Sequence, residues 1–119
     1  MSQIIPISQK RTFTLEEAQE LLPVIRRITK EAVEKFVLLE RKLKKQQAIS
    51  QAWDSVEVEI SDLLNKWSDK ISKLGALPKG IWLVDFDSGQ GYYCWRYDEE
   101  TIENFHGYEE GFSSRTLIQ

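Results

Sequence analysis

Cysteine is almost absent from this sequence, in which Cys94 is the only thiol. One cysteine cannot form an intramolecular disulfide, so the fold depends on no such bond. Sparse cysteine is typical of proteins from a reducing compartment, and we expect a cytoplasmic protein. Residues 1–11 also lack the apolar segment behind a basic start that marks a signal peptide.

Long hydrophobic runs and an excess of basic charge are missing as well. No segment approaches the roughly 18 apolar residues that span a bilayer, so we expect no membrane partner. The net charge of −3 argues against a nucleic-acid partner. The basic cluster at 41–45 suggests an RNA or phospholipid patch, but carboxylates at 54–59 offer an internal match if the chain folds back. We favour the internal match or plain solvated charge.

What the sequence does contain is typical of a globular protein. Hydrophobic residues make up 41% and charged residues 29% of its 119 positions, which excludes a disordered chain. This length corresponds to one domain, and we predict a single domain over 1–119 with an irregular leader at 1–11. No internal repeat is visible.

A long helix with a kink is predicted over 14–47. Thr14 and Glu17 have the spacing of a capping box, and apolar residues then recur every three or four positions as far as Leu43. Pro23 lies within this pattern and removes one backbone hydrogen bond. Because the pattern keeps its phase, we favour a kink near Pro23. The alternative is a short helix over 14–21, with Pro23 in the first turn of a second helix.

A second helix is predicted over 52–74. Its apolar pattern runs from Trp53 to Leu74, and Gly75 and Pro78 follow as stop signals. Two long helices with a short connection form an antiparallel hairpin. Such a hairpin leaves apolar surface uncovered, so we expect a homodimer in which four helices complete a bundle. The sequence identifies no other protein partner.

The last third is rich in aromatic residues, and its pattern predicts a β-hairpin over 80–97. Residues 87–90 read as the turn, in a register that pairs Phe86 with Gly91. One face then carries Trp82, Val84, Phe86, Tyr93 and Trp95, and the other carries Ile81, Leu83, Asp85, Tyr92, Cys94 and Arg96. A short helix and an ordered tail are predicted over 99–119. The predicted fold class is α+β, a helical hairpin covered by this β-hairpin, short helix and tail.

Several segments together resemble a small prokaryotic family of uncharacterised proteins, domain of unknown function twenty-two-oh-three. They are Thr14-Leu15-Glu16-Glu17-Ala18, Leu21-Leu22-Pro23, Leu83-Val84-Asp85-Phe86, Cys94-Trp95 and the tail His106…Gly111-Phe112…Arg115. The resemblance runs from about Phe13 to Arg115. The sequence departs from the family pattern at Trp82 and Asp98, where glycine is usual, and at Phe105, where tryptophan is usual. The resemblance implies no established activity.

Five residues in the last third form the candidate site. They are Asp85, Cys94, Glu99, His106 and Arg115. His106 and Glu103 have the spacing of half a di-metal site on a helix, but no second histidine exists, and we expect no metal and no cofactor. Cys94 and His106 suggest an activated nucleophile, with Asp85 or Glu99 orienting the imidazole, although a mid-strand cysteine is usually a small buried hydrophobe.

Arg115 has two interpretations. With His106 it suggests a small-anion site, whereas a pair with Asp85 or Glu99 would attach the tail to the hairpin. We favour the structural pair. The function that the sequence favours is therefore a non-enzymatic interaction or assembly protein. The alternatives are a metal-dependent or Cys/His enzyme and a small-anion binding module.

Overall fold

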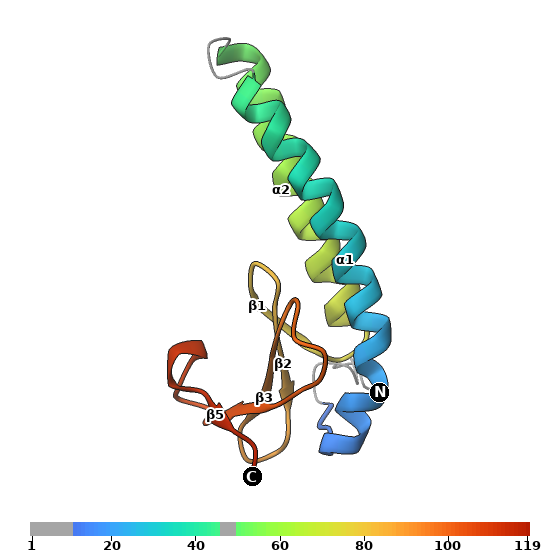
Figure 1. Cartoon of the computed structure of the whole chain (residues 1–119), viewed down its shortest axis with the longest axis vertical. Coiled ribbons are helices and arrows are strands. Elements are labelled where there is room, and N and C mark those ends of the chain that lie inside the picture. The colour runs from blue at the N-terminus through green and yellow to red at the C-terminus, as the bar shows by residue number, and fades with distance from the viewer. Residues whose placement is uncertain (1–10, 46–49) are drawn as a thin grey trace, which may run out of the picture.

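A computed structural model describes the backbone of residues 11–45 and 50–119. Two helices, α1 (Leu15–Lys45) and α2 (Ser50–Lys73), precede five strands. The strands are β1 (Leu77–Gly80), β2 (Leu83–Asp87), β3 (Tyr92–Arg96), β4 (Asn104–His106) and β5 (Thr116–Leu117), with the short 3-10 helix η2 (Phe112–Ser114) before β5 (Figure 1). The predicted leader, apart from Arg11, lies outside the described residues, and so do residues 46–49 of the predicted connection at 46–51. Residues 50 and 51 already belong to α2.

Helix α1 begins at the predicted capping box and continues through its proline. The backbone N–H of Thr14 donates to Glu17 Oε1 at 2.9 Å, and that of Glu17 donates to Thr14 Oγ1 at 3.1 Å. Pro23 lies inside α1, so the alternative of a helix that ends at residue 21 is wrong. Figure 1 shows α1 bending in its first turns, drawn in blue.

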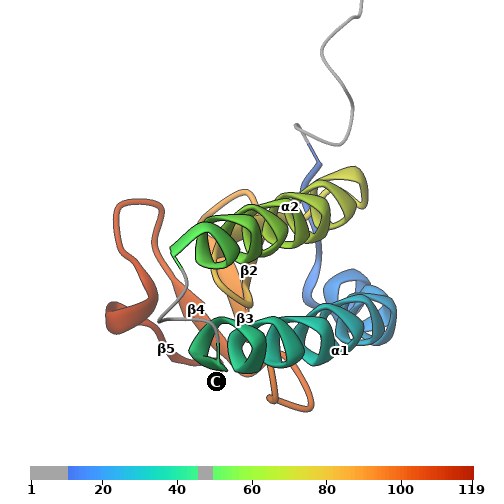
Figure 2. The same ribbon diagram turned by 90° about the horizontal axis from the view of Figure 1, so that it is seen from above.

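The two helices run antiparallel and side by side, as the end-on view in Figure 2 also shows. Trp67 donates its indole N–H to the Thr29 hydroxyl at 2.9 Å, and both side chains are buried between the helices. A buried indole N–H needs such a partner, which explains a threonine within the apolar pattern of α1. Among the described residues, neither helix is long and apolar enough to cross a membrane.

The last third forms a five-stranded antiparallel sheet in the order β1-β2-β3-β4-β5. The predicted fold class is therefore wrong in this part of the chain: the fold is α+β, but a complete sheet replaces the β-hairpin with a short helix and tail. Strand β1 pairs with β2, and β4 and β5 add to the far side of β3. A two-stranded hairpin would leave both edges unpaired, and these flanking strands satisfy them.

The hairpin register differs from the prediction by two residues. Phe86 pairs with Tyr93, and Asp87 pairs with Tyr92, so Gly91 belongs to the loop. In that loop Ser88 donates both its backbone N–H and its hydroxyl to the carbonyl oxygen of Gly91. A Cβ at Gly91 would lie 2.7 Å from the backbone oxygen of His106, so only glycine fits beside β4. A shift of two residues preserves both faces of the hairpin.

The predicted helix over 99–106 is wrong, because Gln19 of α1 holds this segment in an extended conformation. The Gln19 side-chain amide donates to the carbonyl oxygen of Ile102 at 2.9 Å and accepts from its N–H at 3.0 Å. Ile102 is buried in the core, and the Trp95 indole N–H donates to the carbonyl oxygen of Glu99 at 2.8 Å. The side chains of Gln19 and Trp95 thus bind backbone groups that a helix would need for its own hydrogen bonds. The chain stays extended and continues into β4.

Replacing Gln19 should destabilise the fold through Ile102. In Gln19→Met, both backbone groups of Ile102 lose their partner, and we expect a loss of about 1–3 kcal/mol in the free energy of unfolding. At neutral pH, Gln19→Glu keeps the acceptor for the Ile102 N–H but turns a carboxylate oxygen toward the Ile102 carbonyl oxygen, so it should lose stability as well. Urea denaturation followed by tryptophan fluorescence measures both variants. Equal stability of Gln19→Met and the wild type would contradict this account of β4.

Candidate functional site

The sheet separates apolar from chemically reactive side chains by its two-residue alternation. Val84, Phe86 and Trp95 are fully buried in the core that the sheet shares with α1 and α2. Asp85 and Cys94, each one position away, lie on the opposite face and pair directly with each other across β2 and β3. A one-residue slip would move both polar side chains into the core.

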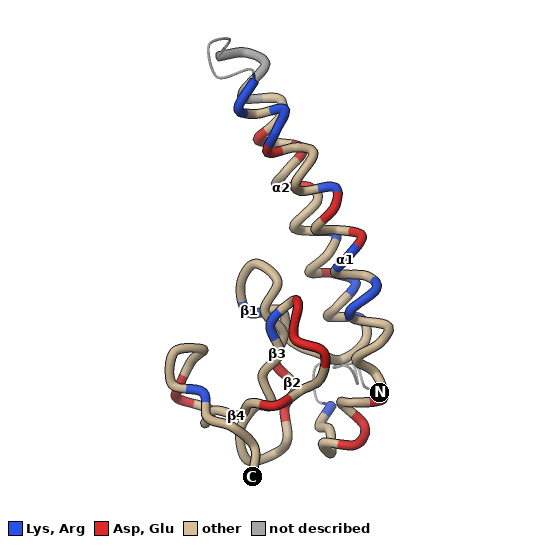
Figure 3. The backbone as a smooth tube through the Cα atoms, in the orientation of Figure 1, with Lys and Arg blue, Asp and Glu red and all other residues tan. Residues whose placement is uncertain are grey.

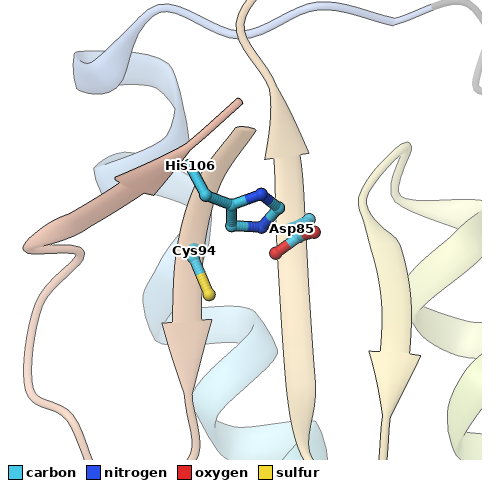
Figure 4. A group of neighbouring side chains, drawn as sticks. All are labelled: Asp85, Cys94 and His106. Carbon is cyan, nitrogen blue, oxygen red and sulfur yellow. Dashed lines mark hydrogen bonds and ion pairs between the residues drawn. The ribbon is translucent and has the colours of Figure 1, made fainter. Parts of the chain in front are cut away.

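Three potential ligands meet on this second face. Asp85 comes from β2, Cys94 from β3 and His106 from β4, and Figure 4 shows their side chains converging (Figure 4). A carboxylate oxygen of Asp85, Sγ of Cys94 and a ring nitrogen of His106 all lie within 4.8 Å of one another. The three side chains are 3%, 1% and 4% exposed, respectively. Groups of this kind are rarely buried together without a partner.

The hydrogen bonds of His106 define its tautomer. Nδ1 lies 2.9 Å from the carbonyl oxygen of Gly107, which can only accept, so Nδ1 carries a proton. Nε2 lies 3.0 Å from Oδ2 of Asp85. One further proton therefore lies between the imidazole and the carboxyl group, either on Nε2 or on Asp85. Nε2 is therefore the ring nitrogen on the side of Asp85.

The other two candidates form an ion pair beside this cluster. Arg115 donates to Glu99 through two nitrogens, at 2.6 and 3.2 Å. The same guanidinium lies 3.9 Å from Cys94 Sγ through Nη1, within reach of a weak N–H···S bond. The structural ion pair that was predicted for Arg115 is thus made with Glu99. This ion pair holds the segment before β5 against the β3–β4 connection. The structure brings all five sequence candidates into one connected group.

Burial controls the ionisation of this group. Burial raises the pKa of the Asp85 carboxyl group, although the neighbouring His106 opposes the shift. Burial, and then the negative charge of Asp85, raise the pKa of Cys94 to about 11, against the opposing effect of Arg115. Burial also acts to raise the pKa of Glu99, but the bonds from Arg115 and from the Arg96 backbone prevail and lower it. The pocket thus disfavours the anionic form of an acidic side chain unless a cation pairs with it.

A cavity of about 210 Å³ opens beside Asp85, Cys94 and His106. Its other lining residues come from the edges of the sheet and the loop after β4; they are Lys79, Leu83, Tyr92, Tyr108, Glu110, Gly111 and Phe112. Tyr108 donates to Asp87 at 2.7 Å, and Glu110 accepts from the backbone N–H of Gly107 at 2.8 Å. These bonds fold the loop over the ligand face.

The sequence predicted Leu83 and Tyr92 on this face, but it gave no sign that Lys79, Tyr108 and Glu110 would line the cavity. Lys79 reaches the cavity because β1 adds to the sheet beside β2, a pairing that the sequence pattern did not reveal. Glu110 and Tyr108 are placed by the turn after Gly107. No local motif marks that turn, so the only available signal was their closeness to His106 in the sequence.

Comparison with known proteins places the chain in a family. A family model described as "Uncharacterized conserved protein (DUF2203)" matches residues 11–118. The chain belongs to this family. A search of curated proteins and a search of solved structures each found no match. Membership in DUF2203 assigns no activity, so the chemistry has to be argued from the site.

Two of the departures from the usual DUF2203 pattern have a structural meaning. Trp82 (φ 65°) and Asp98 (φ 91°) are the non-glycine residues with positive φ in the described part of the chain. Glycine adopts this conformation without strain, which explains its usual presence there in the family. Trp82 compensates by edge-on contacts with the rings of Phe36 and Trp67. These turns are therefore backbone requirements of the fold.

The raised pKa of Cys94 predicts how its thiol reacts. The rate of alkylation by iodoacetamide should keep rising with pH through the alkaline range, because the thiolate forms only near pH 11. In Asp85→Asn one nearby negative charge is gone, so the inflection should move to lower pH. Mass spectrometry of timed samples gives the rates. An inflection near neutral pH in the wild type would instead indicate an activated nucleophile.

Proposed function

We propose that this protein binds a divalent transition metal of the zinc class through Asp85, Cys94 and His106. The observation that carries the proposal is the convergence of three buried ligand types from three adjacent strands, with Nε2 of His106 lying 3.0 Å from Oδ2 of Asp85. Carboxylate oxygen, thiolate sulfur and imidazole nitrogen are the ligands that Zn²⁺ takes in proteins. Strand positions hold such ligands more rigidly than loops do.

The hydrogen bond from Nδ1 of His106 to the Gly107 carbonyl supports this role. Metal-binding histidines usually donate their second ring N–H to a carbonyl or carboxylate, which fixes the ring and leaves the other nitrogen free to bind. Bonds of 2.0–2.3 Å in a tetrahedral zinc site separate ligand atoms by roughly 3.3–3.8 Å. The three ligand atoms lie within 4.8 Å of one another, so a closing of about 1 Å completes the set.

Charge balance favours the binding of a divalent cation by these three ligands. A carboxylate, a thiolate and a neutral imidazole together carry two negative charges, which one divalent cation neutralises. Burial raises the pKa of Asp85 and of Cys94 because each anion is unfavourable there without a cation. A bound cation reverses that effect on both groups. Binding then replaces two protons, one from the Cys94 thiol and one shared by Asp85 and His106.

The alternatives from the sequence receive less support. For a Cys/His nucleophile, Nε2 of His106 should face Cys94, but it bonds to Asp85 at 3.0 Å, and the pKa of Cys94 is raised. For an anion site, Arg115 should be free, but Glu99 occupies it. The proposal departs from our expectation of no metal, which assumed that His106 lay on a helix beside Glu103.

The cavity provides room for a fourth ligand. Three protein ligands and one open position are typical of catalytic zinc sites, whereas structural sites use four protein ligands. The open side faces the cavity of about 210 Å³, where Lys79 and Tyr108 offer polar groups and Phe112 an apolar wall. This arrangement fits a small exchangeable ligand or water. The predicted assembly role concerns the helices and stays a prediction independent of this centre.

Zinc titration of tag-free, chelator-treated protein tests the proposal. We expect one equivalent to bind, with release of about two protons at neutral pH, measured by calorimetry in buffers of different ionisation enthalpy. Cobalt should give a thiolate-to-metal charge-transfer band that Cys94→Ser abolishes. Asp85→Asn should weaken zinc binding at least tenfold, because it removes one ligand charge.

Asp87→Asn is the matched control. Asp87 lies two residues further along β2, bonds to Tyr108 and to the backbone of Gly89, and is outside the three-ligand set. Its zinc affinity should equal that of the wild type. Circular dichroism confirms that both variants are folded. Stoichiometric binding that survives Asp85→Asn and Cys94→Ser, or no binding by the folded wild type, would overturn the proposal.

A further inference from the structure

The helices extend beyond the sheet as an arm whose base contacts the β1–β2 turn through Phe36 and Trp82, and whose remainder reaches past the strands. We define the helical arm as residues 35–45 of α1 and 55–66 of α2, which Figure 1 shows reaching away from the strands. Leu38 is 62% exposed and Val58 is 60% exposed on this arm. Two helices alone leave part of their apolar surface in water, which favours a further helical neighbour.

One side of the helical arm carries a shallow groove of about 440 Å³ between the two helices. Its floor is formed by three leucines, Leu38 and Leu39 of α1 and Leu63 of α2. Its charged residues are Lys35, Glu59, Asp62 and Lys66. Nearer the tip, Lys42 forms an exposed ion pair of 3.4 Å with Glu59. This pair joins the basic segment to the acidic segment, as the sequence predicted.

The charges of the groove are ordered along its length. Helix α1 runs away from the sheet, so Lys35 lies closer to the sheet than the leucines that follow it. Helix α2 runs back, so Glu59 and Asp62 lie closer to the tip than Lys66. The groove is therefore basic at the sheet end and acidic toward the tip, where Lys42 offsets part of the acidic charge through its exposed pair with Glu59. Figure 3 shows Lys and Arg in blue and Asp and Glu in red along the two helices (Figure 3).

We propose that a second copy of this chain docks in the groove with its helical arm antiparallel to the first. A two-fold axis through the groove brings its basic end against the acidic end of the other copy, twice by symmetry. The leucines of both copies then meet in the middle and complete a four-helix bundle. A parallel copy would oppose like charges, and a peptide of one charge sign would match only one end.

This surface is distinct from the metal centre, so the two proposals are tested separately. Sedimentation equilibrium of the full chain in the presence of EDTA should show a dimer at micromolar concentration. Leu38→Asp should raise the dimer dissociation constant at least tenfold, because it places a charge in the middle of the contact. Val58→Asp is the matched control, since Val58 is equally exposed but lies outside the groove.

Charge exchange tests whether opposite charges of the two grooves hold the dimer together. A variant with Lys35→Glu and Lys66→Glu has an all-acidic groove, and one with Glu59→Lys and Asp62→Lys has an all-basic groove. Each alone should be monomeric, and an equimolar mixture should form a mixed dimer. Circular dichroism confirms helicity in every sample.

Three results would overturn the proposal. They are a monomeric wild type, a dimer that Val58→Asp weakens as much as Leu38→Asp, or single-sign variants that dimerise as well as the wild type. A mixture that stays monomeric would contradict charge pairing between the two grooves.

Discussion

The pairing of β2 with β3 is the constraint on which the rest of this structure depends. With Asp85 opposite Cys94, the side chains of Val84, Phe86 and Trp95 face the helices, and those of Asp85 and Cys94 face the other way. The same register leaves Gly91 in the loop, where β4 can approach closely and bring His106 beside Asp85. The apolar core and the candidate metal centre therefore both follow from the alternation of side chains between the two faces of β2 and β3.

The helices and the two faces of the hairpin were accessible from the sequence because local rules determine them. The capping box at Thr14, the three-to-four spacing of apolar residues and the alternation around Asp85 each act within a few positions. Family membership was also predicted from motif order, and the match over residues 11–118 confirms it.

The remaining errors come from contacts between residues far apart in the sequence. Gln19 bonds to Ile102 across 83 positions, and no local propensity reveals that this side chain prevents a helix there. Strand β1 joins the sheet although its Leu-Pro-Lys-Gly sequence is not typical of a strand. The expectation of no metal stays untested; it rested on the helical spacing of His106 and Glu103, whereas the proposed site draws its ligands from adjacent strands.

The charge balance of the buried ligands explains the properties of the candidate centre. Three buried groups meet, and the pKa values of Asp85 and Cys94 are raised because burial disfavours their anions. In the metal-free state two protons balance the site, and a divalent cation can replace both. Glu99 and Arg115 balance each other beside it, so their ion pair leaves the charge of the three ligands unchanged.

The most direct test of this account is the protonation of the imidazole, and the sequence makes it clean because His106 is the only histidine. Long-range 1H–15N correlation spectra of tag-free protein with one equivalent of Zn²⁺ should show a proton on Nδ1 and none on Nε2, with the Nε2 resonance shifted by the metal. An Nε2 that stays protonated and unshifted in the presence of zinc would contradict the metal centre.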